Sequence, residues 1–500
     1  MGDAAPATLE QPAGDVLHLI DGELCASAGG GWLENIEPAT GRPLGRIARG
    51  TAEDVDRAVA AATAAKEHWA SCPAEERAGW LEMLADAIEA NLEALARAES
   101  IDNGKPLELA RTVDIPRAVA NFRFFAGAVR HRRDEAFIHD AERAADTINY
   151  VLRRPVGVAG CISPWNLPLY LLTWKIAPAL AAGCPVVAKP SEVTPLTAHL
   201  LGMLAAEIGL PAGVLNLVHG LGGEAGAAIV AHPGVPAISF TGGTATGRAI
   251  ASVAAPMFKH LSLELGGKNP AIIYDDADLE RAIPGVARAA FANQGQICLC
   301  GSRLLVHRPV YDRVLEGVVA LAGSMRCGDP LVAGTRQGAL VSESHRAKVE
   351  QAIDEARAEG GEILCGGRRP DPESLPERVR GGFFVEPTVI AGLGPACRTN
   401  TQEIFGPVLG VLPFEDEDEA VAIANATEYG LAATVWTRDL DRAHRTAGRV
   451  DAGICWINCW LLRDLRTPFG GVKSSGVGRE GGDEALRFFT EPTNVCVRLS

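Results

Sequence analysis

The chain has 500 residues, of which 47% are hydrophobic and 22% are charged. This composition is ordinary for a folded globular protein, and the length exceeds what one hydrophobic core usually organises, so we expect two or three packed domains. The formal net charge of −15 argues against nucleic acid as a partner, because phosphate contacts require clustered Lys and Arg side chains. No apolar run reaches the ~20 residues that span a bilayer, and the amino terminus lacks a secretory pattern, so we expect a cytoplasmic protein that binds no membrane.

The first 130 residues are predicted to be mainly helical. Residues 19–38 alternate and turn like a short hairpin, and Thr51 with two acidic residues then precedes an apolar stripe of period 3.6, which predicts a capped amphipathic helix. Residues 73–106 continue as two helices, and a further helix is expected to begin at Pro116.

From Tyr150 onward, short apolar runs alternate with helical segments, which predicts a parallel sheet covered by helices on both faces. A second series of strands and helices begins near residue 270 and implies a second α/β domain. Ligands of such sheets bind beyond the carboxyl ends of the strands. We therefore expect three loops to lie together there, with the sequences SPWN, KPSE and FTGG.

Two of these loops offer contacts for a nucleotide. The fingerprint G-x-G-x-x-G is absent from its usual place, but the Gly-rich turn before a helix starting near Thr244 exposes backbone N–H groups to phosphate. A plain turn is the alternative. Glu192 could accept both hydroxyls of a ribose while Lys189 orients them, and the alternative is a surface ion pair at the start of a helix.

Three further residues suggest chemistry at carbon. Glu264 lies between apolar neighbours, where loss of water could raise its pKa and make it a general base, unless it is a paired core residue. The segment FANQGQICLC contains Cys298 and Cys300, whose spacing is poor for zinc, so we expect no metal and one reactive thiol. The side-chain amide of Asn166 can donate a hydrogen bond to an oxyanion.

Seven motifs, collinear over nearly the whole chain, resemble the aldehyde dehydrogenase superfamily: SPWNLP, AKPSE, FTGGTATG, LELGGKNP, FANQGQIC, QEIFGP and PFGGVKSSGVGRE. The resemblance implies an α/β fold with a Rossmann-like NAD-binding domain, an α/β catalytic domain and a small β-flap for assembly into a homodimer or homotetramer. The expected boundaries are 1–130 and 152–264 for the NAD-binding domain, 265–465 for the catalytic domain, and 131–151 with 482–500 for the oligomerisation element.

The resemblance also assigns roles. Cys298 matches the nucleophile of the family, Glu264 its general base and Asn166 its oxyanion donor. The positions that match cofactor contacts are Trp165, Lys189, Glu192, Gly222, Gly242, Gly243, Thr244, Gly266, Glu403 and Phe405. Gly243 departs from the family, where serine is common, which removes one possible hydrogen bond to pyrophosphate and leaves the backbone donors.

Within the superfamily, three segments are most similar to the aminomuconate- and hydroxymuconate-semialdehyde dehydrogenases, with the aminomuconate branch favoured. Their small-molecule substrates carry a carboxylate away from the aldehyde, and Arg117 and Arg463 match the positions expected to bind it. The alternative is that each arginine forms an ion pair, with Asp114 and Asp464 respectively. The rival functions are oxidation of uncharged aldehydes, thiol hydrolysis without redox chemistry, and non-catalytic binding.

Cys300 is expected to be a small neighbour of Cys298 in the pocket. If the two cysteines lie on an extended segment, they share a face and could form a reversible disulfide under oxidation.

Overall fold

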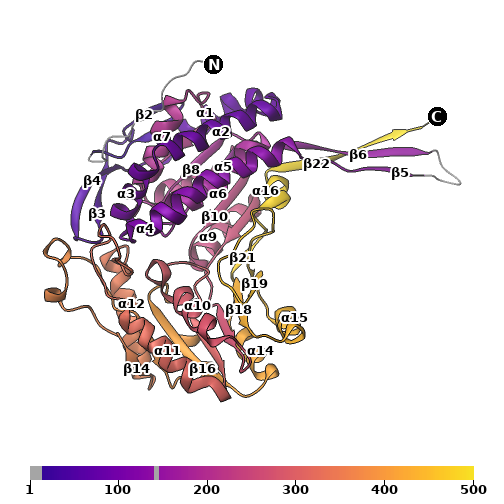
Figure 1. Ribbon diagram of the computed structural model, residues 1–500. Coiled ribbons are helices and arrows are strands. Elements are labelled where there is room, and N and C mark those ends of the chain that lie inside the picture. The colour runs from indigo at the N-terminus through magenta and orange to yellow at the C-terminus, as the bar shows by residue number, and fades with distance from the viewer. Residues whose placement is uncertain (1–13, 140–145, 500) are drawn as a thin grey trace.

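The computed structural model describes residues 14–139 and 146–499 (Figure 1). Two large sheets, each covered by helices, lie next to one another, and a long arm of strands projects from the first (Figure 1). The first sheet has eight strands in the order β2 (Glu23–Cys25), β1 (His18–Ile20), β9 (Leu215–Leu217), β8 (Val186–Lys189), β7 (Ala159–Ile162), β10 (Ala237–Thr241), β11 (His260–Glu264) and β21 (Gly476–Val477). The predicted α/β class is confirmed.

The five central strands of this sheet are parallel, and successive residues face different cores. In β8, Val186 belongs to one hydrophobic cluster and Val187 to another, as the period of two along a buried strand requires. The helices on the Val187 side are α1 (Ala52–Ser71), α8 (Ala227–Ala231) and α9 (Thr244–Ala254). Those on the Val186 side are α6 (Pro168–Ala182) and α7 (Leu196–Glu207), with α2, α3 and α5 packed beyond them.

The amino-terminal helices follow the predicted pattern: α2 (Ala74–Ala90), α3 (Leu92–Asn103), α4 (Leu107–Leu109) and α5 (Ile115–Arg130). The backbone N–H of Thr51 donates to Asp54 at 3.0 Å and caps α1. The start of the last helix differs from the prediction at Pro116, because a π-helical turn at Ala110–Asp114 leads directly into α5. A wider turn accommodates a proline that lacks an N–H group, so the helical path begins before it.

The second sheet has seven strands in the order β14 (Glu362–Cys365), β15 (Thr388–Ala391), β16 (Val408–Phe414), β13 (Arg303–His307), β12 (Pro270–Ile273), β18 (Ala432–Trp436) and β19 (Ile454–Ile457). All but β14 run parallel, which confirms the second α/β series. One face carries α10 (Leu279–Phe291) and α11 (Tyr311–Ser324), and the other carries α14 (Glu417–Asn425) and α15 (Leu440–Arg449). Near β15 lie α12 (Glu343–Ala358) and α13 (Arg398–Thr401).

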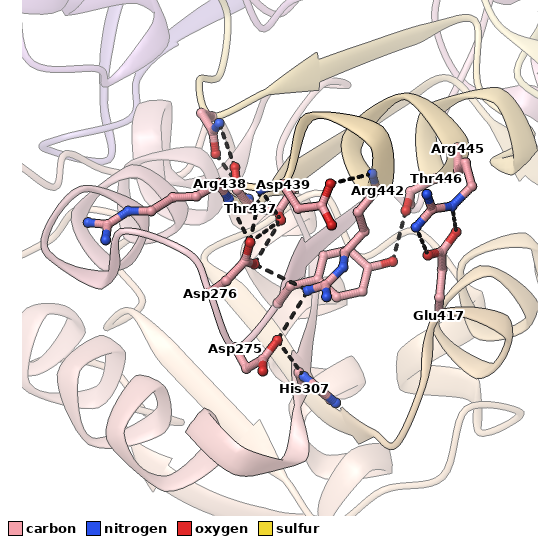
Figure 2. Close-up of polar contacts among 12 residues, drawn as sticks. Asp275, Asp276, His307, Glu417, Thr437, Arg438, Asp439, Arg442, Arg445 and Thr446 are labelled. Atoms are coloured by element: carbon pink, nitrogen blue, oxygen red, sulfur yellow. Dashed lines mark hydrogen bonds and ion pairs between the residues drawn. The ribbon is translucent and has the colours of Figure 1, made fainter.

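The carboxyl edge of this second sheet is closed by an ion-pair network (Figure 2). After β12, Asp276 accepts hydrogen bonds from the hydroxyl of Thr437 at 2.7 Å and from the backbone N–H of Asp439 at 2.9 Å. The guanidinium of Arg442 then bridges Asp275 and Asp276 at 3.1 and 3.2 Å. These groups satisfy one another and hold the start of α15. The opposite end of the sheet, where the amino ends of its strands lie, faces β11 and the loops beyond the first sheet.

The projecting arm consists of β5 (Ala136–His139), β6 (Thr147–Pro155) and β22 (Thr490–Arg498), with β6 in the middle (Figure 1). Smaller elements are the pair β3 (Trp32–Glu37) and β4 (Arg42–Ala48), the pair β17 (Tyr429–Gly430) and β20 (Val472–Lys473), and α16 (Gly482–Phe488). The predicted hairpin is β1–β2, and the rest of that segment enters β3. No helix within 14–139 or 146–499 is long and apolar enough to cross a membrane.

Three histidines lie together near β1, where His18 and His219 are buried and His199 is half-buried. The ring of His219 lies 6.1 Å from that of His18 and 6.4 Å from that of His199. Burial lowers the pKa of His18 from 6.5 to about 4, although the charge of Asp54 opposes this, and it also lowers the pKa of His219 well below its ordinary value. The folded protein therefore binds fewer protons than the unfolded chain below pH 6.5, and stability is lost as pH falls from there toward 4.

The substitution His18→Asn tests this linkage, because asparagine retains an acceptor for the backbone N–H of His219 and cannot titrate. Protonation of His18 is expected to cost the wild type up to about 3 kcal/mol of unfolding free energy as pH falls from 7 toward 4. The variant should show a shallower pH dependence in urea unfolding followed by tryptophan fluorescence. Equal slopes in the two proteins would exclude His18 as a source of acid sensitivity.

Candidate active site

A cavity of about 770 Å³ lies beyond the carboxyl ends of β7, β8 and β10. The three predicted loops meet there, and they bring Trp165, Lys189, Glu192 and Gly243 to its wall. The amine of Lys189 donates to Glu192 at 2.6 Å, and the second oxygen of Glu192 accepts the backbone N–H of Gly222 at 3.4 Å. Lys189 and Glu192 thus form the ion pair expected at this position, and the same pair lines the cavity, where it could contact a ribose.

The amino terminus of α9 forms one side of this cavity. A Cβ on Gly242 would overlap the ring of Phe240, so only glycine fits at that position. At Gly243 no atom lies within 4 Å of where a Cβ would stand, so the serine common in the family would fit and its absence costs no packing. The hydroxyl of Thr244 points to the carbonyl of Ser474 at 3.5 Å, and Thr244 is the one candidate cofactor residue that lines neither cavity of the site.

A second cavity of about 310 Å³ shares Trp165, Gly242 and Gly243 with the first and leads to Cys298. Its far wall contains Asn166, Gly266, Glu403 and Phe405.

Close packing holds Glu403 against the end of β11. One of its oxygens accepts the N–H of Gly267 at 2.8 Å, and a Cβ on Gly266 would overlap the other. Burial raises the pKa of Glu403 to about 7. Phe405 adopts a left-handed backbone with φ of 59°, and its ring stands edge-on to Trp165 at 5.2 Å. The carboxylate and the ring are therefore both fixed at the cavity wall.

Sequence reasoning missed His345 and Lys348, which line this second cavity from α12. The Nε2 atom of His345 lies 2.8 Å from the carbonyl oxygen of Phe405, and its ring is 5.1 Å from that of Trp165. His345 therefore helps to hold Phe405 in its unusual conformation. Nothing in the helical pattern of α12 sets these two positions apart, and only the fold brings them to the cavity.

Cys298 lies in a tight turn and not on an extended segment. The N–H of Cys300 donates to the carbonyl of Ile297 at 2.9 Å, which closes the turn. Cys300 points its thiol toward the carbonyl of Ala292 and is not among the residues that line the two cavities. Because the segment turns, the extended arrangement in which the two cysteines would share a face is not the one observed. Burial, reinforced by the charges of Glu403 and Glu264, raises the pKa of Cys298 well above its ordinary value, so the resting thiol is protonated.

Glu264 ends β11 with only 3% of its surface exposed. Neither carboxyl oxygen has a hydrogen-bond partner among the described residues. Burial and the charge of Glu480 raise the pKa of Glu264 well above its usual value, although Lys175 opposes the shift. Lys175 itself donates to Glu480 at 2.7 Å, so the alternative of a paired core glutamate applies to Glu480 and not to Glu264.

Asn166 is buried with its amide aimed at the loop before the cysteine. Its side-chain Nδ2 donates to the backbone carbonyl of Gln296 at 2.9 Å. The backbone carbonyl of Asn166 accepts a hydrogen bond from the amine of Lys105 at 3.0 Å. Lys105, another residue that sequence reasoning missed, is fully buried and forms ion pairs with Glu99 and Asp114. This ion-paired lysine braces the backbone that positions the Asn166 amide.

The two candidate substrate arginines form no ion pair with any described residue. Asp114 binds Lys105, and Asp464 binds Arg466 at 2.6 Å, so neither acid neutralises its neighbouring arginine. Arg463 instead donates to the hydroxyl of Tyr170 at 3.0 Å, and its Nη2 is buried without a partner among the described residues.

The residues present fit a dinucleotide. The two connected cavities supply a carboxylate for ribose hydroxyls at Glu192, glycine-lined backbone at the start of α9, and a second carboxylate at Glu403 with one oxygen free of backbone donors. Within the part of the chain that the structure describes, no group of three or more His, Cys, Asp and Glu side chains is placed to hold a metal ion.

A crevice beyond a parallel sheet that ends at a half-buried cysteine is the arrangement of a dehydrogenase that acts on aldehydes. The sequence profile of the aldehyde dehydrogenase family matches residues 25–495, and the chain belongs to that family. The resemblance inferred from the seven motifs is thereby confirmed.

Individual relatives are similar over almost their full length. The chain is 48% identical to the 2-aminomuconic semialdehyde dehydrogenase of Mus musculus, over 93% of this chain and 95% of that protein. It is 47% identical to the 2-hydroxymuconic semialdehyde dehydrogenase of Pseudomonas sp. (strain CF600), over 97% of this chain and 100% of that protein. Among solved structures, the NAD⁺ complex of an aldehyde dehydrogenase from Bacillus cereus matches with a TM-score of 0.93 and 41% identity, covering 97% of both chains.

The raised pKa of the Cys298 thiol predicts slow alkylation of the protein without cofactor. Because only the thiolate reacts, the rate with iodoacetamide should rise about tenfold per pH unit without levelling up to pH 9.5. Peptide mass spectrometry follows the modification of Cys298, with the exposed Cys496 as an internal reference and Cys298→Ser to identify the peptide. A plateau below pH 9 would contradict a thiol held neutral by burial.

Proposed function

We propose that this protein oxidises an aldehyde to a carboxylic acid, with Cys298 as the nucleophile and NAD as the hydride acceptor. The observation that carries the proposal is that Cys298, Glu403 and Phe405 line one cavity, which joins the larger cavity of Lys189 and Glu192. A dinucleotide that extends through both would place its two ends beside the ribose-binding pair and the thiol. The carboxylate of Glu192 disfavours the 2′-phosphate of NADP by charge.

The residues of the chain divide the chemistry among them. The sulfur of Cys298 adds to the carbonyl carbon, and the amide of Asn166 with the backbone N–H of Cys298 stabilises the resulting oxyanion. NAD, which Lys189, Glu192 and Glu403 would hold, would supply a hydride acceptor for this carbon, so that a thioester remains on Cys298. Glu264 then takes a proton from water, which attacks the thioester and releases the acid.

Burial keeps both Cys298 and Glu264 protonated in the resting site, and each must lose its proton before it acts. An ionised Glu264 would raise the pKa of Cys298 further, so the two groups are electrostatically coupled. A cationic nicotinamide ring would favour both anions through the same low-polarity surroundings. The half-buried thiol of Cys298 therefore stays unreactive until a nearby cation lowers its pKa.

The substrate we propose is 2-aminomuconate 6-semialdehyde, with 2-hydroxymuconate semialdehyde as the alternative. Both carry a carboxylate remote from the aldehyde. The support is that Arg117 and Arg463 lie within the described fold without acidic partners, and that relatives of both names share close to half of their residues with this chain. Dehydrogenation of uncharged aldehydes would leave these two arginines without a ligand.

The decisive experiment follows NADH absorbance with freshly generated 2-aminomuconate and 2-hydroxymuconate semialdehydes against a panel of uncharged aldehydes. No NADH with any aldehyde would favour non-catalytic binding. Ester cleavage that needs no NAD would favour a thiol hydrolase.

The substitution Arg463→Gln is expected to lower the preference for a carboxylated aldehyde. Hydrogen bonds to charged groups contribute about 1.5–3 kcal/mol, so the ratio of kcat/KM for 6-oxohexanoate over that for hexanal should fall by about 10- to 100-fold. NADH formation at 340 nm measures both values. Arg466→Gln, in the same loop and paired with Asp464, is the matched control and should keep the wild-type ratio. Equal ratios in both variants would exclude a carboxylate-binding role for Arg463.

We also propose that the arm joins two copies of this chain, in the element 131–151 and 482–500, of which 140–145 and 500 lie outside the described residues. The edge strand β5 exposes 57% of Phe137 and 73% of Ile138, and unpaired edge strands with apolar side chains favour association. We retain the division at 1–130 with 152–264 and at 265–465 as part of this proposal.

Ile138→Asp should therefore reduce the oligomeric mass measured by light scattering after size exclusion, because a charge would have to be buried in the contact. Val332→Asp, at another exposed apolar position, is the control and should leave the mass unchanged. A mass that is unaffected by Ile138→Asp would place the contact elsewhere.

A further inference from the structure

Tyr170 lies in the first turn of α6 and contacts both candidate substrate arginines at once. Its hydroxyl oxygen accepts a hydrogen bond from Nη1 of Arg463 at 3.0 Å. The guanidinium of Arg117 lies over its ring, 5.6 Å from the centroid. Tyr170 is 7% exposed, so its position is set by packing and not by solvent.

Because Tyr170 accepts the hydrogen bond from Arg463, the proton of its own hydroxyl group is still free to be donated. A guanidinium has five N–H donors and no acceptor, so the phenol oxygen can only accept from Arg463. The phenol proton must therefore point elsewhere, and it has no acceptor among the described residues. This proton is available to a bound anion.

Arg463 is clamped beside this hydroxyl. Its guanidinium lies 5.0 Å from the ring centroid of Trp174 and 4.0 Å from that of Phe469. Trp174 is one helical turn after Tyr170 on α6, so one face of that helix sets the plane of the guanidinium. The clamp leaves Nη2 buried without a partner among the described residues, and a buried N–H donor of this kind is costly unless a ligand accepts from it.

The other arginine is brought to Tyr170 by helix packing. One turn beyond Arg117 on α5, the amide of Asn121 donates to the carbonyl of Tyr170 at 3.1 Å and to the hydroxyl of Thr173 at 3.0 Å. These bonds fix α5 against α6. They thereby also fix the distance between Arg117 and the phenol ring of Tyr170. Three donor groups, from Arg117, Arg463 and Tyr170, are thus held together, and neither arginine forms an ion pair with a described residue.

We propose that Tyr170 is a specificity-determining residue, which donates its phenol proton to the same substrate carboxylate that Arg117 and Arg463 bind and which holds Arg463 in place to bind it. The inference rests on the proposed carboxylated substrate and adds a residue that neither a motif nor a charge identifies. A carboxylate offers two oxygens and several lone pairs, enough to accept from all three groups.

The variant Tyr170→Phe removes the hydroxyl and keeps the ring under Arg117. We expect the ratio of kcat/KM for 6-oxohexanoate over that for hexanal to fall by about tenfold or more, mainly through KM for 6-oxohexanoate. Adipate, which carries the carboxylate and cannot be oxidised, should inhibit hexanal oxidation competitively, with an inhibition constant raised by a similar factor in the variant. Tyr311→Phe, a half-buried tyrosine on the remote helix α11, is the matched control and should change neither value.

A double-variant comparison separates a shared receptor from two independent effects. If Tyr170 and Arg463 bind one carboxylate, Tyr170→Phe combined with Arg463→Gln should lower the ratio by much less than the product of the two single losses. Multiplicative losses, or an equal loss with 6-oxohexanoate and hexanal, would overturn the role of Tyr170. A wild type that prefers 6-oxohexanoate while Tyr170→Phe keeps that preference would overturn this inference alone. A wild type without any preference would overturn the proposed substrate class as well.

Discussion

The geometry of the site depends on the hydrogen bonds that the side chain of Asn269 forms. Its Nδ2 donates to the carbonyls of Cys298 and Cys300 at 2.7 and 2.9 Å, and its oxygen accepts the N–H of Ala432 at 3.0 Å. One buried amide thus joins the cysteine turn to the starts of β12 and β18. Gly267, two residues earlier, leaves room for the turn, because a Cβ there would stand 2.9 Å from the Cys298 carbonyl.

The two sheets then contribute opposite edges to one crevice. The first sheet contributes its carboxyl edge, where Thr241 and Glu264 end β10 and β11, and the second contributes the amino ends of β12 and β13. The carboxyl edge of the second sheet is filled by Asp275, Asp276 and their partners (Figure 2). Ligands of parallel sheets usually bind beyond the carboxyl ends of the strands. In this protein that rule applies to the candidate cofactor cavity of the first sheet and not to the second sheet.

Burial dominates the electrostatics of this crevice. It is the largest cause that raises the pKa of Cys298, of Glu264 and of Glu403. Ion pairs lie close to the crevice, between Lys175 and Glu480 at 2.7 Å and between Lys105 and Asp114. The candidate substrate arginines are the exception, because aromatic rings and not carboxylates surround Arg463. Two arginines that form no ion pair with a described residue are suited to an anionic ligand.

The sequence indicated the α/β class through its alternating strands and helices, and its motifs indicated the family. The resemblance to that family also supplied ten candidate cofactor positions, of which nine line the two cavities. The sequence could not decide three-dimensional neighbours. The turn at Cys298 is held by Asn269 from 29 residues away, so an extended segment could not be excluded beforehand. Asp114 lies three residues from Arg117, yet burial beside Lys105 gives it a stronger partner. His345, Lys348 and Tyr170 lie on helices whose patterns are ordinary, and only the packing of distant elements turns them toward the site.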